Sequence, residues 1–225
     1  QNKVGKIIIN DLDKTIYSFW KSAIFNTGEF IEKIESTPVN IKEWRKQKEV
    51  YKNKDSSKFD LGFATFFLNR TNRSGIVEGG PIGGMEQKGK WKINARFNKK
   101  DLINRVRRIS YYRDRILVSN KDGIELLKNL KRIKGTFIYL DPPYYKKGGS
   151  LYLNHYKDND HIKLANFLNN NLNLNWILTY DNVDYIKKLY LEREKKEFFL
   201  NYSAYKKTKG SEVMIFSDTL VNKYH

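Results

Sequence analysis

The stretch "IYLDPPYYKK", from Ile138 to Lys147, contains the residue types of this sequence that are best placed to do chemistry. A short apolar segment runs into Asp141, two prolines and two tyrosines. Because prolines lack a backbone N–H and fix φ, a strand must end here and the loop that follows must be stiff. The strand end therefore presents a carboxylate, a carbonyl and an aromatic ring, a combination that can hold a flat polar molecule.

The elements that must position this loop follow a regular alternation. Strands are predicted at 6–13, 115–119, 136–140 and 176–180, helices at 124–131, 161–170 and 183–190, and an antiparallel closing pair at 197–202 and 212–217. Strands that alternate with helices of about ten residues predict an α/β fold with a mostly parallel, doubly wound sheet. Ligands of such sheets bind beyond the carboxyl ends of the strands, which is where the loop at Asp141 falls.

The first half of the chain is less regular. Apolar residues at helical spacing predict a helix over 14–24, and weaker helical patterns lie at 30–34 and 41–51. The glycine-rich stretch 63–102 is not expected to form regular helix, and "KWKINARF" (90–97) alternates like one arm of a hairpin. A basic helix follows, with Leu102, Val106 and Ile109 facing inward.

Composition narrows the class of protein. The 225 residues carry 43 Lys and Arg against 25 Asp and Glu, a formal charge of +18, which favours a polyanionic partner. A general bias toward Lys and Asn is the alternative, but the basic residues cluster with aromatic ones, which suit base stacking. The chain has no Cys and three His without ligand spacing, so thiolate and metal chemistry are not expected. No membrane span or signal peptide is visible, and a soluble cytoplasmic protein is expected.

Several motifs together resemble the Dam-like N6-adenine-specific DNA methyltransferases, the D12 class of the alpha group. Besides the Asp-Pro-Pro-Tyr motif, the similar pieces are "NRTNRSG" (69–75), "GKW.I..RFNK" (89–99), "TYDN" (179–182) and "KGSEVMIFS" (209–217). The resemblance extends over nearly the whole chain. It implies a Rossmann-like sheet, S-adenosylmethionine as methyl donor, and double-stranded DNA from which the target base is flipped.

The resemblance also implies roles for the loop. The Asp141 carboxylate and the Pro142 carbonyl would hold the two hydrogens of an adenine amino group, and Pro143 would stiffen the loop. Tyr144 would stack on the extruded base, whereas Tyr145 either shares in this or packs beneath the loop. An ordinary Pro-Pro turn with a solvated acid is the alternative.

Three carboxylates are expected at the methyl donor, namely Asp11 at its ribose, Asp122 near its adenine, and Asp141. A helix N-cap is the alternative for Asp11 and for Asp122, although Asp13 suits the first of these caps better. The family's Phe-x-Gly-x-Gly donor loop is absent from these residues and would lie just before Gln1. Six strands are predicted where the fold has seven, so we expect that an N-terminal part with the first strand is omitted. A naturally truncated relative is the alternative.

The resemblance divides the chain into a catalytic domain (1–27 and 111–225) and a DNA target-recognition region (28–110). Four glycines (Gly79, Gly80, Gly83 and Gly84) would permit close backbone approach, and the segment is no P-loop. The expected DNA contacts are Asn69, Arg70, Asn72, Arg73, Lys88, Lys90, Lys92, Arg96 and Asn98. Asp181 and Asn182 either edge the active site or cap the helix that follows.

The expected function is that of a site-specific adenine DNA methyltransferase of the EC 2.1.1.72 class, from a bacterium, archaeon or phage. The alternatives are a non-catalytic DNA-binding remnant without a donor pocket, and methylation of cytosine N4 or of RNA. A GATC-type site is the natural first guess, a cognate restriction endonuclease is a candidate partner, and no metal or membrane is expected.

Overall fold

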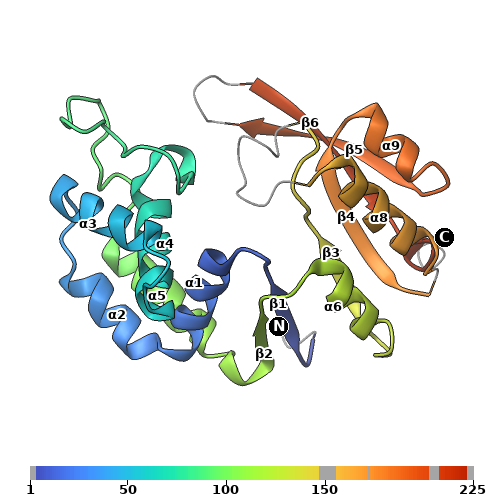
Figure 1. Cartoon of the computed structure of the whole chain (residues 1–225), viewed down its shortest axis with the longest axis horizontal. Coiled ribbons are helices and arrows are strands. Elements are labelled where there is room, and N and C mark those ends of the chain that lie inside the picture. The colour runs from blue at the N-terminus through green and yellow to red at the C-terminus, as the bar shows by residue number, and fades with distance from the viewer. Residues whose placement is uncertain (1–3, 147–155, 172, 203–207, 222–225) are drawn as a thin grey trace. The chain divides into compact units, whose positions relative to one another are not determined.

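The computed structural model describes residues 4–146, 156–171, 173–202 and 208–221. The chain divides into two compact units, an N-terminal unit (Gln1–Lys121) and a C-terminal unit (Asp122–His225). Each unit has its own hydrophobic core, the first built mainly from helices and the second from helices on a sheet. Figure 1 labels the elements of both.

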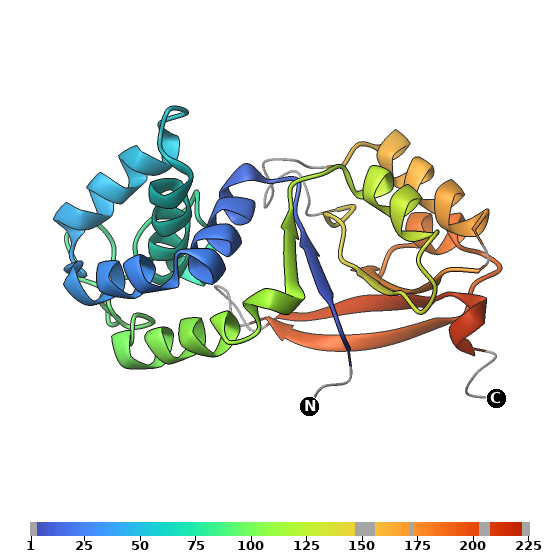
Figure 2. The same ribbon diagram turned by 90° about the horizontal axis from the view of Figure 1, so that it is seen from below.

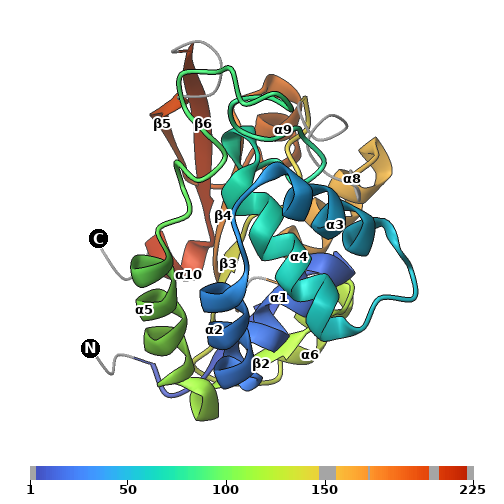
Figure 3. The same ribbon diagram turned by 90° about the vertical axis from the view of Figure 1, so that its left-hand side faces the viewer.

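Five α-helices form most of the N-terminal unit: α1 (Lys14–Phe25), α2 (Thr27–Ser36), α3 (Ile41–Lys52), α4 (Lys58–Thr71) and α5 (Lys99–Ser110). Helix α4 packs against both α1 and α3, as Figure 3 shows from the side of these helices. Glycine is required at position 62 of α4, because a Cβ there would lie 2.4 Å from the Ser18 carbonyl oxygen of α1. The two helices therefore approach each other closely.

The ends of these helices follow from local side chains. Asp13 accepts a hydrogen bond from the Thr15 amide and caps α1, while Asn40 and Ser57 cap α3 and α4 in the same way. Such side-chain acceptors replace the partners that the first amides of a helix lack. The helices predicted at 14–24, 30–34, 41–51 and in the basic segment after 100 are confirmed.

Two expectations for the glycine-rich stretch are wrong. Residues from Phe63 to Thr71 belong to α4, and the helical period is hidden because almost every side chain of this part is buried. The segment 90–97 is not a hairpin arm: Ile93 and Phe97 are buried, and successive turns connect them. The alternation of apolar and polar residues there reflects two buried side chains, Ile93 and Phe97, and not a strand.

The N-terminal unit also contains one parallel strand pair, β1 (Ile7–Asn10) with β2 (Ile116–Ser119). Two short 3-10 turns, η1 (Arg73–Gly75) and η2 (Arg113–Arg115), complete its regular elements among the described residues.

A four-stranded sheet forms the base of the C-terminal unit, in the order β3-β4-β6-β5. Its strands are β3 (Phe137–Leu140), β4 (Asn175–Asp181), β5 (Lys195–Tyr202) and β6 (Thr208–Phe216). Strands β3 and β4 are parallel, whereas β6 runs antiparallel to both of its neighbours. The helices are α6 (Gly123–Leu130), α8 (Asp158–Asn169), α9 (Asp184–Leu189) and the short α10 (Asp218–Val221).

Side-chain alternation along β4 gives the sheet two different faces. Trp176, Leu178 and Tyr180 point into the core that α6, α8 and α9 cover, and Figure 2 shows α6 and α8 on one side of the sheet. Thr179 and Asp181 belong to the opposite face, because successive side chains of a strand alternate. We call this opposite face the Thr179 face.

The mixed α/β class, the six strands and the antiparallel closing pair are confirmed in the described residues. The expected single, mostly parallel sheet is not what these residues form, since the strands fall into two small sheets. Within the described part of the chain, β1 pairs only with β2 and β3 only with β4, so each leaves one edge without a partner strand. No described helix combines the length and the apolar content that a membrane span requires.

Candidate active site

The Asp-Pro-Pro-Tyr loop begins where β3 ends. Asp141 follows Leu140, and its Oδ1 lies 3.1 Å from the Thr179 hydroxyl on the neighbouring strand β4, which donates to it. The hydroxyl of Tyr139 lies 3.1 Å from the same Thr179 oxygen. Asp141 therefore stands on the Thr179 face, at the carboxyl end of the parallel strand pair β3–β4.

The surroundings of Asp141 alter its acidity. Although the residue is exposed as a whole, partial burial of its carboxylate raises the pKa above the ordinary 3.8. The hydrogen bond from Thr179 opposes this rise, and the negative charge of Glu212 adds to it. A carboxylate in this setting is a better proton acceptor than a solvated aspartate.

The side chain of Tyr144 reaches strand β6. Its hydroxyl donates to the Oε1 atom of Glu212 over 2.6 Å, and Glu212 is only 5% exposed. The ring itself is half-buried. The aromatic group that follows the two prolines is thus held at its far end by a buried carboxylate.

Asp181, at the end of β4, holds the backbone of the same loop. Its two carboxylate oxygens accept from the amides of Tyr145 and Lys146 at 2.8 and 2.9 Å. The N-cap alternative for Asp181 and Asn182 is wrong, since α9 has Val183 at its N-cap position and no side-chain cap. Asn182 instead donates to the Ser211 hydroxyl over 2.8 Å.

Tyr145 packs beneath the loop. Its ring stacks on Tyr185 of α9 at a centroid distance of 4.5 Å and meets the edge of His161 of α8 at 5.4 Å. His161 is 1% exposed, and its Nδ1 lies 2.8 Å from the Tyr180 hydroxyl. The packing alternative for Tyr145 is confirmed, which leaves Tyr144 as the aromatic group on the side of Asp141.

The carboxylates expected at the methyl donor lie in both units. Asp11 is half-buried just after β1, its Oδ1 accepts from the Asp13 amide over 2.8 Å, and burial raises its pKa. Because Asp13 caps α1, the cap alternative for Asp11 is wrong. Asp122 does cap α6, accepting from the Glu125 amide over 3.0 Å. A partly desolvated acid at the carboxyl end of a parallel strand fits a ligand with hydroxyl groups, and Asp11 is such an acid.

Several residues expected to contact DNA are used inside the N-terminal unit. Arg70 donates through Nε and Nη2 to the Arg96 carbonyl, at 3.1 and 2.9 Å, and Asn69 donates to the Gly75 carbonyl over 2.9 Å. Asn72 is fully buried: Trp44 donates to its Oδ1, and its Nδ2 donates to carbonyls of the following loop. The expected direct DNA contact by Asn72 is therefore wrong, and its side chain has a structural role instead.

The other expected DNA contacts differ in exposure. Arg73, Lys88, Lys90 and Lys92 are exposed, Arg96 is half-buried, and Asn98 caps α5 through the Asp101 amide. Lys88 forms an exposed ion pair with Glu86, and Lys92 donates to the Gln87 carbonyl. Trp91 lies between Lys90 and Lys92 in the sequence and is 67% exposed, and the Lys90 ammonium lies 5.9 Å from the centroid of its ring.

Two of the four glycines named from the sequence have the backbone that was expected. Gly83 and Gly84 have positive φ angles of 86° and 77°. A Cβ at Gly83 would also lie 2.6 Å from the Trp91 carbonyl oxygen, so this position brings two parts of the segment together. The close approach is made within the protein, and a DNA contact by this loop stays a prediction.

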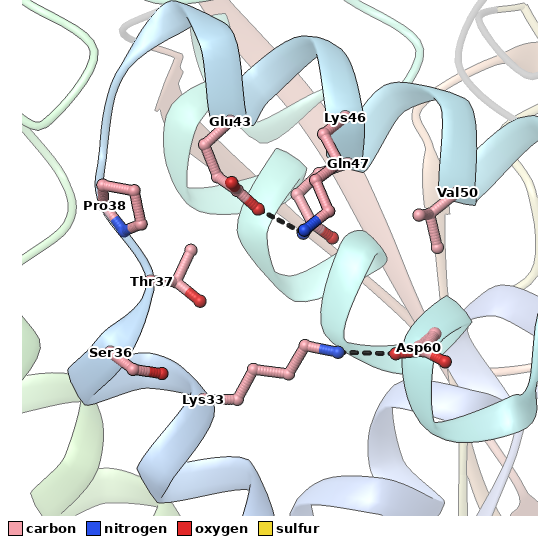
Figure 4. A pocket seen from close by; sticks show the side chains of 9 residues that line it. All are labelled: Lys33, Ser36, Thr37, Pro38, Glu43, Lys46, Gln47, Val50 and Asp60. Atoms are coloured by element: carbon pink, nitrogen blue, oxygen red, sulfur yellow. Dashed lines mark hydrogen bonds and ion pairs between the residues drawn. The ribbon is translucent and has the colours of Figure 1, made fainter.

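A separate hollow of about 350 Å³ lies among α2, α3 and α4 (Figure 4). Four of its polar lining groups have partners within it: Lys33 pairs with Asp60 at 2.5 Å, and Gln47 donates to Glu43 over 2.6 Å. Because charges of both signs are paired within it, the hollow does not define a ligand class.

Sequence reasoning missed two side chains that hold the Asp-Pro-Pro-Tyr loop. Thr179 lies in the "TYDN" motif and Glu212 in "KGSEVMIFS", yet neither was given a role. The signal that could have identified Glu212 is its position. It is an acid within an apolar strand, directly before two residues that are fully buried, Val213 and Ile215. A charge in such a strand needs a partner.

Fold and site together define an α/β protein that carries an Asp-Pro-Pro-Tyr loop at the carboxyl end of a parallel strand pair. The model of the D12 class N6 adenine-specific DNA methyltransferase family matches residues 1–208, and the chain belongs to that family. No curated protein matches the chain.

Proposed function

We propose that this protein transfers a methyl group from S-adenosylmethionine to the N6 amino group of adenine in double-stranded DNA, after the base is extruded from the helix. The observation that carries this proposal is that the Asp141 carboxylate and the Tyr144 hydroxyl, three residues apart in one loop, are each held by a side chain of the sheet. Membership of the family supports the same reaction.

The chemistry requires activation of a poor nucleophile, because the N6 lone pair is delocalised into the adenine ring. The Asp141 carboxylate and the Pro142 carbonyl are two acceptors for the two amino hydrogens, and accepting both favours a tetrahedral nitrogen. When bound, S-adenosylmethionine would supply an electrophilic methyl carbon to the N6 lone pair, with S-adenosylhomocysteine as the leaving group. Asp141, with its raised pKa, then receives the proton that N6 releases. Catalysis is mainly positioning and electrostatics.

For the methyl donor, we propose Asp11 as the acceptor for ribose hydroxyls, with Asp122 near the adenine and Asp141 at the methyl group. Asp11 is the best supported of the three, because its carboxylate is partly desolvated and Asp13 takes over the cap of α1. The finer statement about the fold also belongs here. The parallel pairs β1–β2 and β3–β4 and the antiparallel β6 support a Rossmann-like methyltransferase sheet.

For DNA, we propose contacts by the exposed basic residues of the N-terminal unit, chiefly Arg73, Lys88, Lys90 and Lys92. The net charge of +18 supports a polyanionic partner. Four further residues remain candidates for DNA contacts, although their side chains or backbone also form hydrogen bonds within the protein: Asn69, Arg70, Arg96 and Asn98.

A second candidate is a DNA-binding module without catalysis. The observation that favours it is that these 225 residues contain no Phe-x-Gly-x-Gly motif for the methionine part of the donor. Such a module would bind DNA but not S-adenosylmethionine.

Mass spectrometry of nucleosides tests the proposal. The intact protein is incubated with isotopically labelled S-adenosylmethionine and with duplex DNA or RNA in separate arms. We expect label in N6-methyladenine from DNA. Label in N4-methylcytosine or in RNA would replace the proposed substrate, and DNA binding without donor binding would favour the module.

A further inference from the structure

We infer that Glu212 is a positioning residue that orients the Tyr144 ring toward the base held at Asp141. This inference rests on the proposed function. It deepens the site by assigning a role to a strand residue outside the Asp-Pro-Pro-Tyr motif.

The sheet register places Glu212 next to a residue that holds the same loop. Glu212 of β6 pairs with Asp181 of β4, so the two side chains leave the sheet on the same face. Asp181 accepts the amides of Tyr145 and Lys146, whereas Glu212 accepts the hydroxyl of Tyr144. Two neighbouring acids therefore hold the backbone and the ring of one short segment.

The geometry of tyrosine makes this contact an orientation device. Cβ and the hydroxyl lie at opposite ends of the ring axis, so anchoring both ends fixes the direction of that axis. The backbone anchors one end through the prolines before Tyr144, and Glu212 anchors the other over 2.6 Å. Only rotation about the axis remains, and a ring so held offers a face on which a base can stack.

The burial of Glu212 argues that this contact is specific. A carboxylate that is 5% exposed is costly unless hydrogen bonds compensate it, and a short bond from a phenol to a carboxylate is of the strong, charge-assisted kind. The charge also acts on the neighbouring acid, since Glu212 contributes to the raised pKa of Asp141. Glu212 thus acts on both functional side chains of the loop. It accepts a hydrogen bond from Tyr144, and its charge acts electrostatically on Asp141.

Four variants of the intact protein test the inference. Glu212→Leu removes the acceptor, Glu212→Gln keeps an acceptor oxygen without the charge, and Tyr144→Phe keeps the ring without the hydroxyl. The double variant Tyr144→Phe/Glu212→Leu tests coupling. Glu197→Gln is the matched control, since it changes an exposed acid on the adjacent strand β5. Thermal unfolding verifies that each variant is folded.

The expected result is a pattern of four effects on DNA methylation. Glu212→Leu and Tyr144→Phe each lower kcat by about tenfold, the size of one charge-assisted hydrogen bond, and the double variant is no slower than either. Glu212→Gln recovers kcat to within about threefold of the parent. In Glu212→Gln the acidic side of the profile of kcat against pH moves to lower pH, because the negative charge that helps to raise the pKa of Asp141 is gone. Fluorescence of 2-aminopurine at the target adenine shows extrusion in all four.

A second measurement does not depend on activity. A fluorotyrosine at position 144 should give one sharp fluorine resonance in the parent and a broadened or divided one in Glu212→Leu. Parent-like kcat or an unchanged resonance in Glu212→Leu overturns the inference, as does a double variant slowed by the product of the single effects. A parent that does not methylate adenine instead refutes the proposed function, and the fluorine resonance still decides the role of Glu212.

Discussion

Two irregular segments of this protein are held in opposite ways. The Asp-Pro-Pro-Tyr loop of the C-terminal unit is held from outside, by Thr179 and Asp181 on β4 and Glu212 on β6. The glycine-rich segment (72–98) of the N-terminal unit is held largely by its own polar side chains, with Asn69 and Arg70 of α4 as additional donors to its carbonyls. Asn72 binds three of its carbonyls, and Gln87 bonds to the Ile82 and Gly84 carbonyls and the Ile93 amide.

The difference shows which side chains a segment can offer to a ligand. Where neighbouring strands supply the supporting groups, the loop's own Asp141 and Tyr144 stand at the sheet edge. Where the segment supports itself, the side-chain amides of Asn72 and Gln87 are used for internal hydrogen bonds, and the exposed groups include Arg73, the lysines and Trp91. A polar residue in a loop is therefore a weak sign of binding until its internal partners are known.

The largest effect on stability is expected when the self-supporting segment loses its central side chain. Asn72→Ala removes an amide that is bonded to Trp44 and to three loop carbonyls, and should lower the free energy of unfolding by about 3 kcal/mol. Chemical denaturation measures this. Asn94→Ala, an exposed change in the same segment, is the control and should be near neutral. A stable Asn72→Ala protein with weakened DNA binding would restore the binding role.

The corresponding change in the externally held loop should act on rate more than on stability. Asp181→Ala removes the acceptor of two loop amides and should lower kcat/KM for methylation by about a hundredfold, through loss of two charge-assisted hydrogen bonds. Asp184→Ala, at an exposed acid nearby on α9, serves for comparison. If both variants kept the parent rate, the loop would not need Asp181.

The lysines of the glycine-rich segment should affect DNA binding alone. Replacing Lys88, Lys90 and Lys92 with Glu should weaken binding to all sequences and reduce the salt slope by roughly one unit per lost phosphate contact. Titrations at several salt concentrations give the slope. Lys128, Lys131 and Lys134, exposed on the C-terminal unit, provide a matched triple reversal. Equal slopes for parent and variant would mean that the three lysines are solvated bystanders.

The smallest effect concerns the packing beneath the Asp-Pro-Pro-Tyr loop. Burial lowers the pKa of His161 below the ordinary 6.5, against the opposing charges of Asp158, Asp181 and Asp160. The unfolded chain therefore binds this proton more readily, and stability should fall as pH drops below about 6.5. In His161→Gln this part of the pH dependence of unfolding should be lost. An unaltered pH dependence would show that the pKa of His161 is the same in the folded and the unfolded state.

Much of this architecture could be predicted from the sequence, for a physical reason. Strands such as 136–140 and 176–180 are short apolar runs bounded by turn residues, and the prolines at 142 and 143 fix where β3 must stop. The position of Asp141 at a strand end follows from local chemistry. Helix α4 was missed in its second half because a segment buried on all sides has no amphipathic period.

The supporting partners could not be predicted, because they depend on register. Glu212 meets Tyr144 across 68 positions of the chain, and nothing local in either motif specifies that pairing. The same holds for Asn72, which looks like a surface residue in "NRTNRSG" and is fully buried against Trp44. Long-range pairing decides whether a polar side chain supports the fold or faces a ligand.

The central claim is that Asp141 activates the adenine amino group, and one measurement tests it most directly. Formation of N6-methyladenine is followed in a single turnover for the parent, Asp141→Ala and Asp141→Asn, with DNA affinity measured in parallel. Both variants should lose at least about a thousandfold in rate, through loss of a preorganised acceptor at the reacting nitrogen, while DNA affinity stays near that of the parent. Methylation within a few-fold of the parent in Asp141→Ala would contradict the account.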